Sequence, residues 1–225
     1  MRLPQSIPAF LLIAVLCLAT GSAEAAKQPY IAAHQINFGT GNKYLQATDI
    51  QLGGAGLPLL FTRTYNSQNS ESSALGYGWT AATTERLIIT ASLINLVQEG
   101  GRYVAFKNDG SGTWINQTGQ KRSIVANGSG YQLKEANGTI RQFTTSGQLT
   151  SITDRNNNVR SYTYSGALPA TISDNFGRSL AFTYSDGKLT GIESPLGTFT
   201  YSYTNDNLTR VDKPALLKQL FHLGC

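Results

Sequence analysis

The stretch that decides the fold is residues 147–164, GQLTSITDRNNNVRSYTY. Leu149 and Ile152 stand before a polar turn over residues 154–158, and the part after the turn alternates Ser or Thr with Tyr162 and Tyr164. A period of two places the tyrosines on one face of a strand and the hydroxyl side chains on the other. The stretch therefore predicts a β-hairpin with one aromatic face.

The same pattern recurs through the C-terminal half of the chain. Four β-branched residues are 20, 20 and 19 residues apart: Ile152, Ile172, Ile192 and Val211. A leucine precedes each of them by three or four residues: Leu149, Leu168, Leu189 and Leu208. Aromatic residues follow the turns: Tyr162, Tyr164, Phe182, Tyr184, Tyr201 and Tyr203. A fixed period of this length is typical of a repeat fold. We expect an all-β protein in which successive hairpins pair into one long antiparallel meander.

A carboxylate stands at or near the start of three repeat turns, Asp154, Asp174 and Asp212, and Ser194 takes this place in another. Such a side chain can accept hydrogen bonds from the N–H groups of its own turn. Calcium ligation by stacked carboxylates is the alternative, because calcium prefers oxygen ligands. Each turn offers a single acid, however, so the sequence favours turn capping.

The composition argues against several classes of function. The net charge is +5, but Lys and Arg stand mostly singly, whereas nucleic-acid-binding proteins cluster them on one face. The only histidines, His34 and His222, lie far apart, and neither belongs to a metal-binding or catalytic motif. We therefore expect no enzyme, no cofactor, no metal site and no nucleic-acid partner.

Residues 1–25 have the features of a cleaved signal helix. Arg2 precedes an apolar stretch over residues 9–19, and Ala23-Glu24-Ala25 matches a signal-peptidase site. The apolar stretch is short for a membrane span, although an uncleaved signal anchor is the alternative. We expect export through the inner membrane to the periplasm, cell surface or medium, with no stable membrane span after cleavage. Cys225 alone remains in the mature chain, which excludes an intramolecular disulfide.

The mature chain divides into two zones, residues 26–106 and residues 107–225. In the first zone Leu59, Phe61 and Tyr65 alternate onto one face of a predicted strand. The second zone holds the repeats, and Lys218–Leu223 is predicted to be one further strand of an incomplete unit. An array that ends on an open hydrophobic edge invites association.

The stretch 147–164 resembles a YD repeat of the Rhs family, and residues 186–192, DGKLTGI, repeat its opening. Residues 40–44, 58–66 and 75–79 (LGYGW) resemble the domain that commonly precedes such repeats, so the resemblance covers nearly all of the mature chain. It implies that the repeats form a curved β-sheet, here part of a hollow shell. In many relatives that shell encloses a C-terminal toxin domain.

The chain departs from the family pattern because it lacks the further repeats, the self-cleaving core segment and the toxin domain. We expect the truncated front end of such a protein, with a non-catalytic structural or interaction role. The resemblance implies further YD-repeat segments or a toxin and immunity system as partners. The alternative is a carbohydrate-binding module whose aromatic face stacks on sugars through Tyr162, Tyr164, Phe182, Tyr184, Tyr201 and Tyr203.

Overall fold

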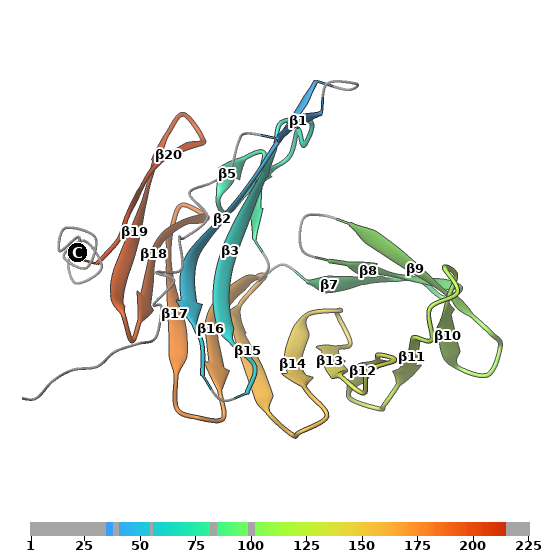
Figure 1. The fold of residues 1–225 in the computed structure, drawn as a ribbon. Helices are drawn as coiled ribbons and strands as arrows, with labels where there is room; N and C mark the ends of the chain where they lie inside the picture. Colours follow the sequence, from blue (N-terminus) through green and yellow to red (C-terminus); the bar gives the residue numbers. More distant parts are fainter. Residues whose placement is uncertain (1–34, 38–40, 55, 82–84, 99–101, 215–225) are drawn as a thin grey trace, which may run out of the picture. The chain divides into compact units, whose positions relative to one another are not determined.

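The computed structural model describes residues 35–37, 41–54, 56–81, 85–98 and 102–214. The predicted signal helix (residues 1–25), His34, His222 and the strand predicted at Lys218–Leu223 lie outside the described residues. Within them every ordered element is a β-strand and every strand pair is antiparallel, so the all-β prediction is confirmed (Figure 1). No helix in this part of the chain is long and apolar enough to cross a membrane.

A four-stranded sheet and a two-stranded hairpin come first. The small sheet has the order β1-β2-β3-β6. Its strands are β1 (Gln35–Asn37), β2 (Asn42–Leu52), β3 (Leu59–Asn66) and β6 (Trp79–Ala81). The hairpin consists of β4 (Ser72–Ser73) and β5 (Gly76–Tyr77) and carries the glycine-rich corner of the first zone.

The large sheet contains fourteen strands in sequence order from β7 to β20, as a meander requires. Its first half comprises β7 (Arg86–Ile89), β8 (Leu93–Val97), β9 (Tyr103–Asn108), β10 (Thr113–Asn116), β11 (Ser123–Ala126), β12 (Gly130–Lys134) and β13 (Ile140–Thr144). Its second half comprises β14 (Leu149–Thr153), β15 (Val159–Ser165), β16 (Leu168–Asp174), β17 (Ser179–Ser185), β18 (Lys188–Ser194), β19 (Gly197–Thr204) and β20 (Asn207–Asp212).

The end strand β7 also contacts the turn before β14. The N–H of Leu87 donates to the carbonyl oxygen of Gly147 over 2.8 Å, and Arg86 forms an isolated bridge with Gln148. Gly147 has a φ of +88°, and a Cβ there would collide with the Leu87 carbonyl. Glycine is therefore required at this close approach.

Each repeat carries a β-bulge at the same place. The pairing shifts at Gln142/Phe143, Thr163/Tyr164, Thr183/Tyr184 and Ser202/Tyr203. In three repeats the bulged residue is a threonine whose hydroxyl donates to the opposite strand's carbonyl: Thr150 to Gln142 (3.1 Å), Thr190 to Thr183 (3.2 Å) and Thr209 to Ser202 (3.1 Å). The threonine hydroxyl thus donates a hydrogen bond to a backbone carbonyl at the point where the bulge interrupts the ladder.

One assignment from the sequence was wrong. Leu168 was placed with the repeat leucines, but Pro169 is the residue paired with Tyr164, as Leu189 is with Tyr184 and Leu208 with Tyr203. Leu168 pairs instead with Ser165, beside the tight turn. The cause is the unequal spacing of four rather than three residues before Ile172. This repeat also has Ala170 where the others have the bulge threonine.

The two strands of a predicted repeat, on either side of its polar turn, share a shorter ladder than the strands that a tight two-residue turn joins. Only three residue pairs join β14 to β15 and β16 to β17, whereas five or six join β15 to β16 and β17 to β18. Beyond the short ladders, tyrosine hydroxyls bridge adjacent strands: Tyr164 donates to the Leu149 carbonyl and Tyr203 to the Leu189 carbonyl, both over 2.8 Å. Tyr164 and Tyr203 therefore hold together the two strands of their own repeat, β14 with β15 and β18 with β19.

The predicted turn capping is confirmed. Asp154 accepts hydrogen bonds from the N–H groups of Asn156 (2.8 Å) and Asn158 (2.9 Å). Asp174 does the same for Phe176 (2.9 Å) and Arg178 (3.0 Å). No group of three or more metal-ligating side chains occurs in the described part of the chain.

A candidate interaction site between the two sheets

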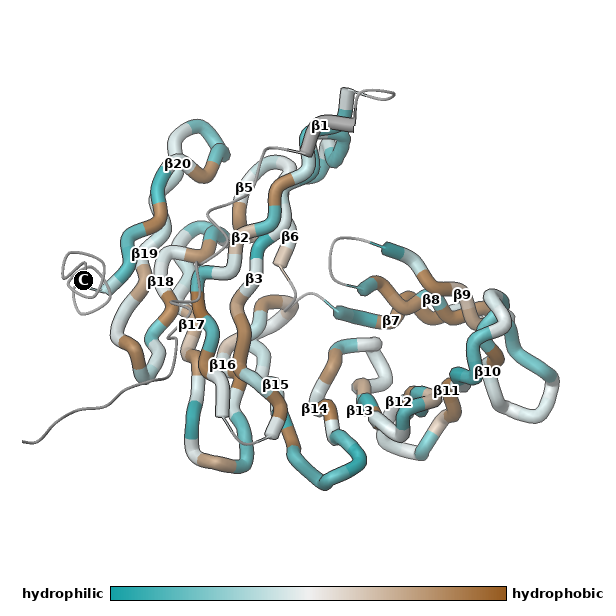
Figure 2. Tube along the Cα trace, viewed as in Figure 1, coloured by the Kyte–Doolittle hydropathy of each residue, from teal (hydrophilic) through white to brown (hydrophobic). Residues whose placement is uncertain are grey.

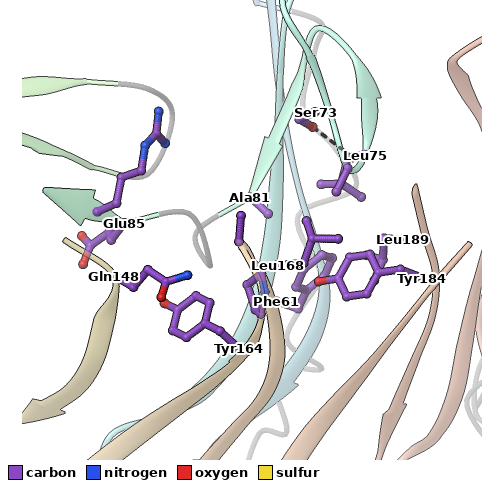
Figure 3. Close-up of a pocket in the computed structure, with 14 residues that line it drawn as sticks. Phe61, Ser73, Leu75, Ala81, Glu85, Gln148, Tyr164, Leu168, Tyr184 and Leu189 are labelled. Atoms are coloured by element: carbon purple, nitrogen blue, oxygen red, sulfur yellow. Dashed lines mark hydrogen bonds between the residues drawn. The ribbon is translucent and has the colours of Figure 1, made fainter. Parts of the chain in front are cut away.

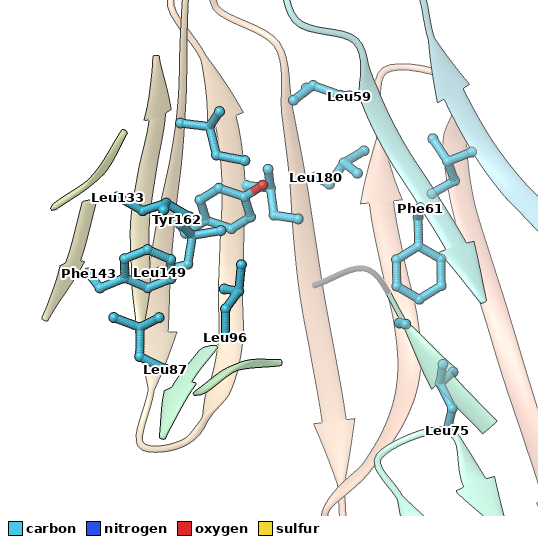
Figure 4. Close-up of a cluster of buried hydrophobic side chains, with 14 of the residues drawn as sticks. Leu59, Phe61, Leu75, Leu87, Leu96, Leu133, Phe143, Leu149, Tyr162 and Leu180 are labelled. Carbon is cyan, nitrogen blue, oxygen red and sulfur yellow. The ribbon is translucent and has the colours of Figure 1, made fainter. Parts of the chain in front are cut away.

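The small sheet packs on the aromatic face of the repeats through Phe61 of β3. Its ring lies 5.7 Å from that of Phe182 and 6.0 Å from that of Tyr201, centroid to centroid, and its side chain is only 1% exposed. Leu59, Phe61 and Leu75 join the same hydrophobic cluster as the repeat residues (Figure 4). Most hydrophobic stretches lie within strands, and most turns are hydrophilic (Figure 2). The two sheets therefore share one core.

A buried polar cluster fixes the position of the small sheet on the large one. Asp49 is the extra residue of a bulge in β2, between Thr48 and Ile50, and the bulge directs both Asp49 and Ile50 inward. The Asp49 carboxylate pairs with the guanidinium of Arg63 (2.7 Å and 3.2 Å) and accepts a hydrogen bond from the Tyr201 hydroxyl (3.1 Å). Arg63 also lies over the Trp79 ring, 4.6 Å from its centroid.

This cluster is costly to break because its charges are desolvated. Removing one member of a buried ion pair leaves an uncompensated charge. Burial, with a further contribution from the Asp49 charge, raises the pKa of Tyr201, so its hydroxyl stays protonated and donates. The Tyr201 hydroxyl of β19 is thus hydrogen-bonded to Asp49 of β2, a residue 152 positions earlier in the chain.

At one end of the sheet, the glycine-rich segment after β2 meets the turn of β16 and β17. Arg178 bonds to Asp174 (2.6 Å) and also donates to the carbonyl of Gly53. A Cβ at Gly56 would lie 2.6 Å from the ring of Phe176. The glycines therefore allow the backbone to approach this turn closely, in addition to forming the bend that the sequence suggested.

At the opposite end, the β4–β5 hairpin meets the turns of β18 and β20. Backbone hydrogen bonds run from Leu189 to Ala74 (2.8 Å) and from Tyr77 to Asp206 (2.9 Å). The Lys188 ammonium donates to the Ser73 carbonyl over 2.9 Å. The first zone therefore contacts the repeats at both sets of turns and in the middle of the sheet.

A cavity of about 270 Å³ lies under the small sheet beside β16 and β17, beyond the last residue pair that joins these two strands. Its walls include Phe61, Leu75, Tyr164, Pro169 and Tyr184, and Figure 3 shows the Tyr184 ring directed into it. Tyr184 makes no hydrogen bond with the described residues, in contrast to Tyr164 and Tyr203. Burial raises its pKa. The cavity coincides with the repeat in which Pro169 replaces leucine.

The six aromatic residues predicted to stack on glycans all belong to the shared core or pack against it. Tyr162 is 8% exposed and Tyr201 4% exposed. Tyr164, Phe182, Tyr184 and Tyr203 are half-buried. The structure brings all six to one face, and it assigns to Tyr164, Tyr201 and Tyr203 hydrogen bonds with the protein itself.

Asp49, Arg63 and Lys188 are interface residues that the sequence did not predict. A signal was present for the first, because Asp49 stands directly before Ile50 inside a strand that otherwise alternates. An acid beside a core residue in a strand is a mark of a bulge or of a buried pair. No such signal distinguished Arg63 or Lys188 from surface charges.

Comparisons with known proteins match parts of the chain. Residues 33–106 match the profile of a family described as a domain of unknown function, DUF6531. A stretch of 117 residues, 52% of this chain, is 33% identical to the tRNA nuclease WapA of Bacillus subtilis (strain 168). Over the same length it is 32% identical to the tRNA3(Ser)-specific nuclease WapA of Bacillus spizizenii. The match spans only 5% of the length of either relative.

Proposed function

We propose that this chain is a non-catalytic, exported structural segment of an Rhs/YD-repeat protein of the polymorphic-toxin type. In this role the repeat sheet forms part of a shell, and the first zone (residues 26–106) covers the aromatic inner face of that sheet. The toxin and immunity context follows from the similarity to WapA, whose nuclease activity belongs to that protein and not to this segment. Further YD-repeat segments are its proposed partners.

The observation that carries the proposal is the shared core of the two sheets. Phe61 contacts two successive repeats through Phe182 and Tyr201, and the Asp49–Arg63 pair is closed by the Tyr201 hydroxyl. A face used in this way stabilises an assembly.

The test has two parts, both on the full chain carrying an epitope tag. Expressed in bacteria, the chain is expected outside the cytoplasm and shortened by residues 1–25, whereas a control lacking residues 1–25 stays inside. Incubated with total tRNA, the purified chain is expected to leave it intact while an added nuclease degrades it. Cleavage that follows the chain through successive purification steps, or cytoplasmic retention of the uncut chain, would refute the proposal.

Glycan binding by the aromatic face stays a prediction. A sugar would have to reach the half-buried rings, of which Tyr184 is directed into the cavity. The test is a glycan array probed with the chain and with Tyr184→Ala, using the exposed Tyr103→Ala as a matched control. Binding lost only with Tyr184→Ala would support the alternative, and an array without signal would exclude it for the glycans tested.

A further inference from the structure

The cavity beside β16 and β17 has walls that are mostly apolar and partly aromatic. Its volume of about 270 Å³ exceeds that of an apolar cavity of about 150 Å³ that admits a benzene ring. The rings of Phe61, Tyr164 and Tyr184 line it together with Leu75 and Pro169 (Figure 3). Aromatic side chains pack favourably against a further ring in edge-to-face or offset arrangements. The cavity therefore has room for one substituted ring and walls that suit it.

One polar group in these walls is available to a molecule in the cavity. Four polar side chains of the walls are bonded to the protein itself: Ser73, Glu85, Gln148 and Tyr164. Tyr184 differs from them, because its hydroxyl makes no hydrogen bond with any described residue and its ring is directed into the cavity. Burial raises the pKa of Tyr184, so its hydroxyl stays protonated at neutral pH and can donate.

The other repeats show which hydrogen bond is missing at this place. Tyr164 and Tyr203 each donate to the backbone carbonyl of the leucine in their own repeat. In the repeat of Tyr184 the leucine position is taken by Pro169, and no hydrogen bond joins these two residues in the described part of the chain. Proline also has a smaller side chain than leucine. The same substitution therefore accompanies both the space and the unpaired hydroxyl.

We propose that this cavity binds a single-ring aromatic compound carrying one hydroxyl or carbonyl oxygen, which accepts a hydrogen bond from Tyr184. The ring of the ligand packs against Phe61 and Tyr164. A sugar fits poorly, because each of its hydroxyl groups buried without a partner is costly. Arg86 in the wall is exposed, so the cavity lies close to solvent on that side. Residues 82–84 lie outside the described residues and are no part of the proposed site. This binding is separate from the structural role proposed above.

The test is a ligand-observed NMR titration of the purified full chain with two probes. These are p-cresol and toluene, which has the same ring and methyl group without the oxygen. Both are expected to bind saturably. In Tyr184→Phe the affinity for p-cresol is expected to fall about fivefold, the loss of one hydrogen bond, while the affinity for toluene stays the same. The matched control is Tyr103→Phe, the same change at a tyrosine that is 60% exposed, and it should leave both affinities unchanged.

A second variant, Pro169→Leu, places the leucine of the other repeats in the cavity. It is expected to weaken the binding of both probes by at least about tenfold while circular dichroism shows a folded chain. Ala81→Leu fills the cavity from another wall and covers the case in which Pro169→Leu does not fold.

The absence of saturable binding to the full chain would overturn the proposal, as would unchanged binding by a folded cavity-filling variant. Unchanged p-cresol binding by Tyr184→Phe would also overturn it, because the hydroxyl would then serve water only. Displacement of p-cresol by glucose would assign the cavity to sugars instead. None of these outcomes bears on export or on tRNA cleavage.

Discussion

Replacing Phe61 by alanine tests whether the small sheet and the repeats form one cooperative core. Phe61 is 1% exposed and lies against two rings of the large sheet. Truncating a buried phenylalanine costs about 3–5 kcal/mol in unfolding free energy. Because two aromatic contacts are lost as well, we expect the upper part of that range, about 4–5 kcal/mol. For a domain of this size that corresponds to a fall of roughly 8–20 °C in melting temperature.

The assay is urea unfolding followed by tryptophan fluorescence. Trp79 reports on the small sheet and Trp114 on the large one. Chains that keep only one of the two (Trp79→Phe or Trp114→Phe) separate the signals. With Phe61→Ala both transitions are expected to move together to lower urea. The milder Phe61→Leu, costing about 1–2 kcal/mol, covers the case in which the alanine variant does not fold.

The control is Tyr103→Thr, at a tyrosine that is 60% exposed, and its effect is expected to stay within about 0.5 kcal/mol. A loss below about 1 kcal/mol for Phe61→Ala would refute the shared core. A shift of the Trp79 transition alone would likewise contradict it, since the repeats would then be stable without their cap.

Three further predictions concern the repeats. Ala170→Thr should raise stability by about 0.5–1.5 kcal/mol by restoring the bulge hydroxyl, and Thr190→Val should lower it by a similar amount, both measured by thermal unfolding. Gly147→Ala should cost about 1–3 kcal/mol, because φ is +88° and the Cβ meets a carbonyl; an unchanged melting temperature would contradict the close approach. Burial alone would raise the pKa of Asp174, but hydrogen bonds from Arg178 and Phe176 outweigh it and the pKa is lowered. The ionised Asp174 carboxylate therefore stabilises the folded chain above pH 3.8, and this stabilisation is lost as the pH falls below that value. The difference in melting temperature between the wild type and Asp174→Asn should accordingly disappear in acid.

The repeat sheet could be predicted from the sequence because its pattern is local. A hairpin needs only alternation and a turn signal, and both lie within about twenty residues. Leu168 shows where this reasoning fails. A one-residue change in spacing moved Pro169 into the leucine position, and the pattern of apolar residues alone could not separate the two.

The placement of the small sheet could not be predicted, because it depends on contacts between distant parts of the chain. The hydrogen bond between Asp49 and Tyr201 spans 152 positions. Whether Asp49 points inward depends on a bulge, and a one-residue shift in register turns a side chain to the opposite face. The glycine-rich segment likewise revealed a bend but not the turn that it approaches.

The ladders beside the tight turns are longer than those beside the polar turns, and this difference has a geometric consequence. Each hairpin is held along most of its length, whereas adjacent hairpins are held at one end and spread at the other, where the bulges lie. Each hairpin is therefore farther from its neighbour at one end than at the other, and a row of such hairpins forms a curved sheet. The radius of that curve is set within a single unit of about twenty residues. Adding repeats lengthens the curved sheet without changing its radius.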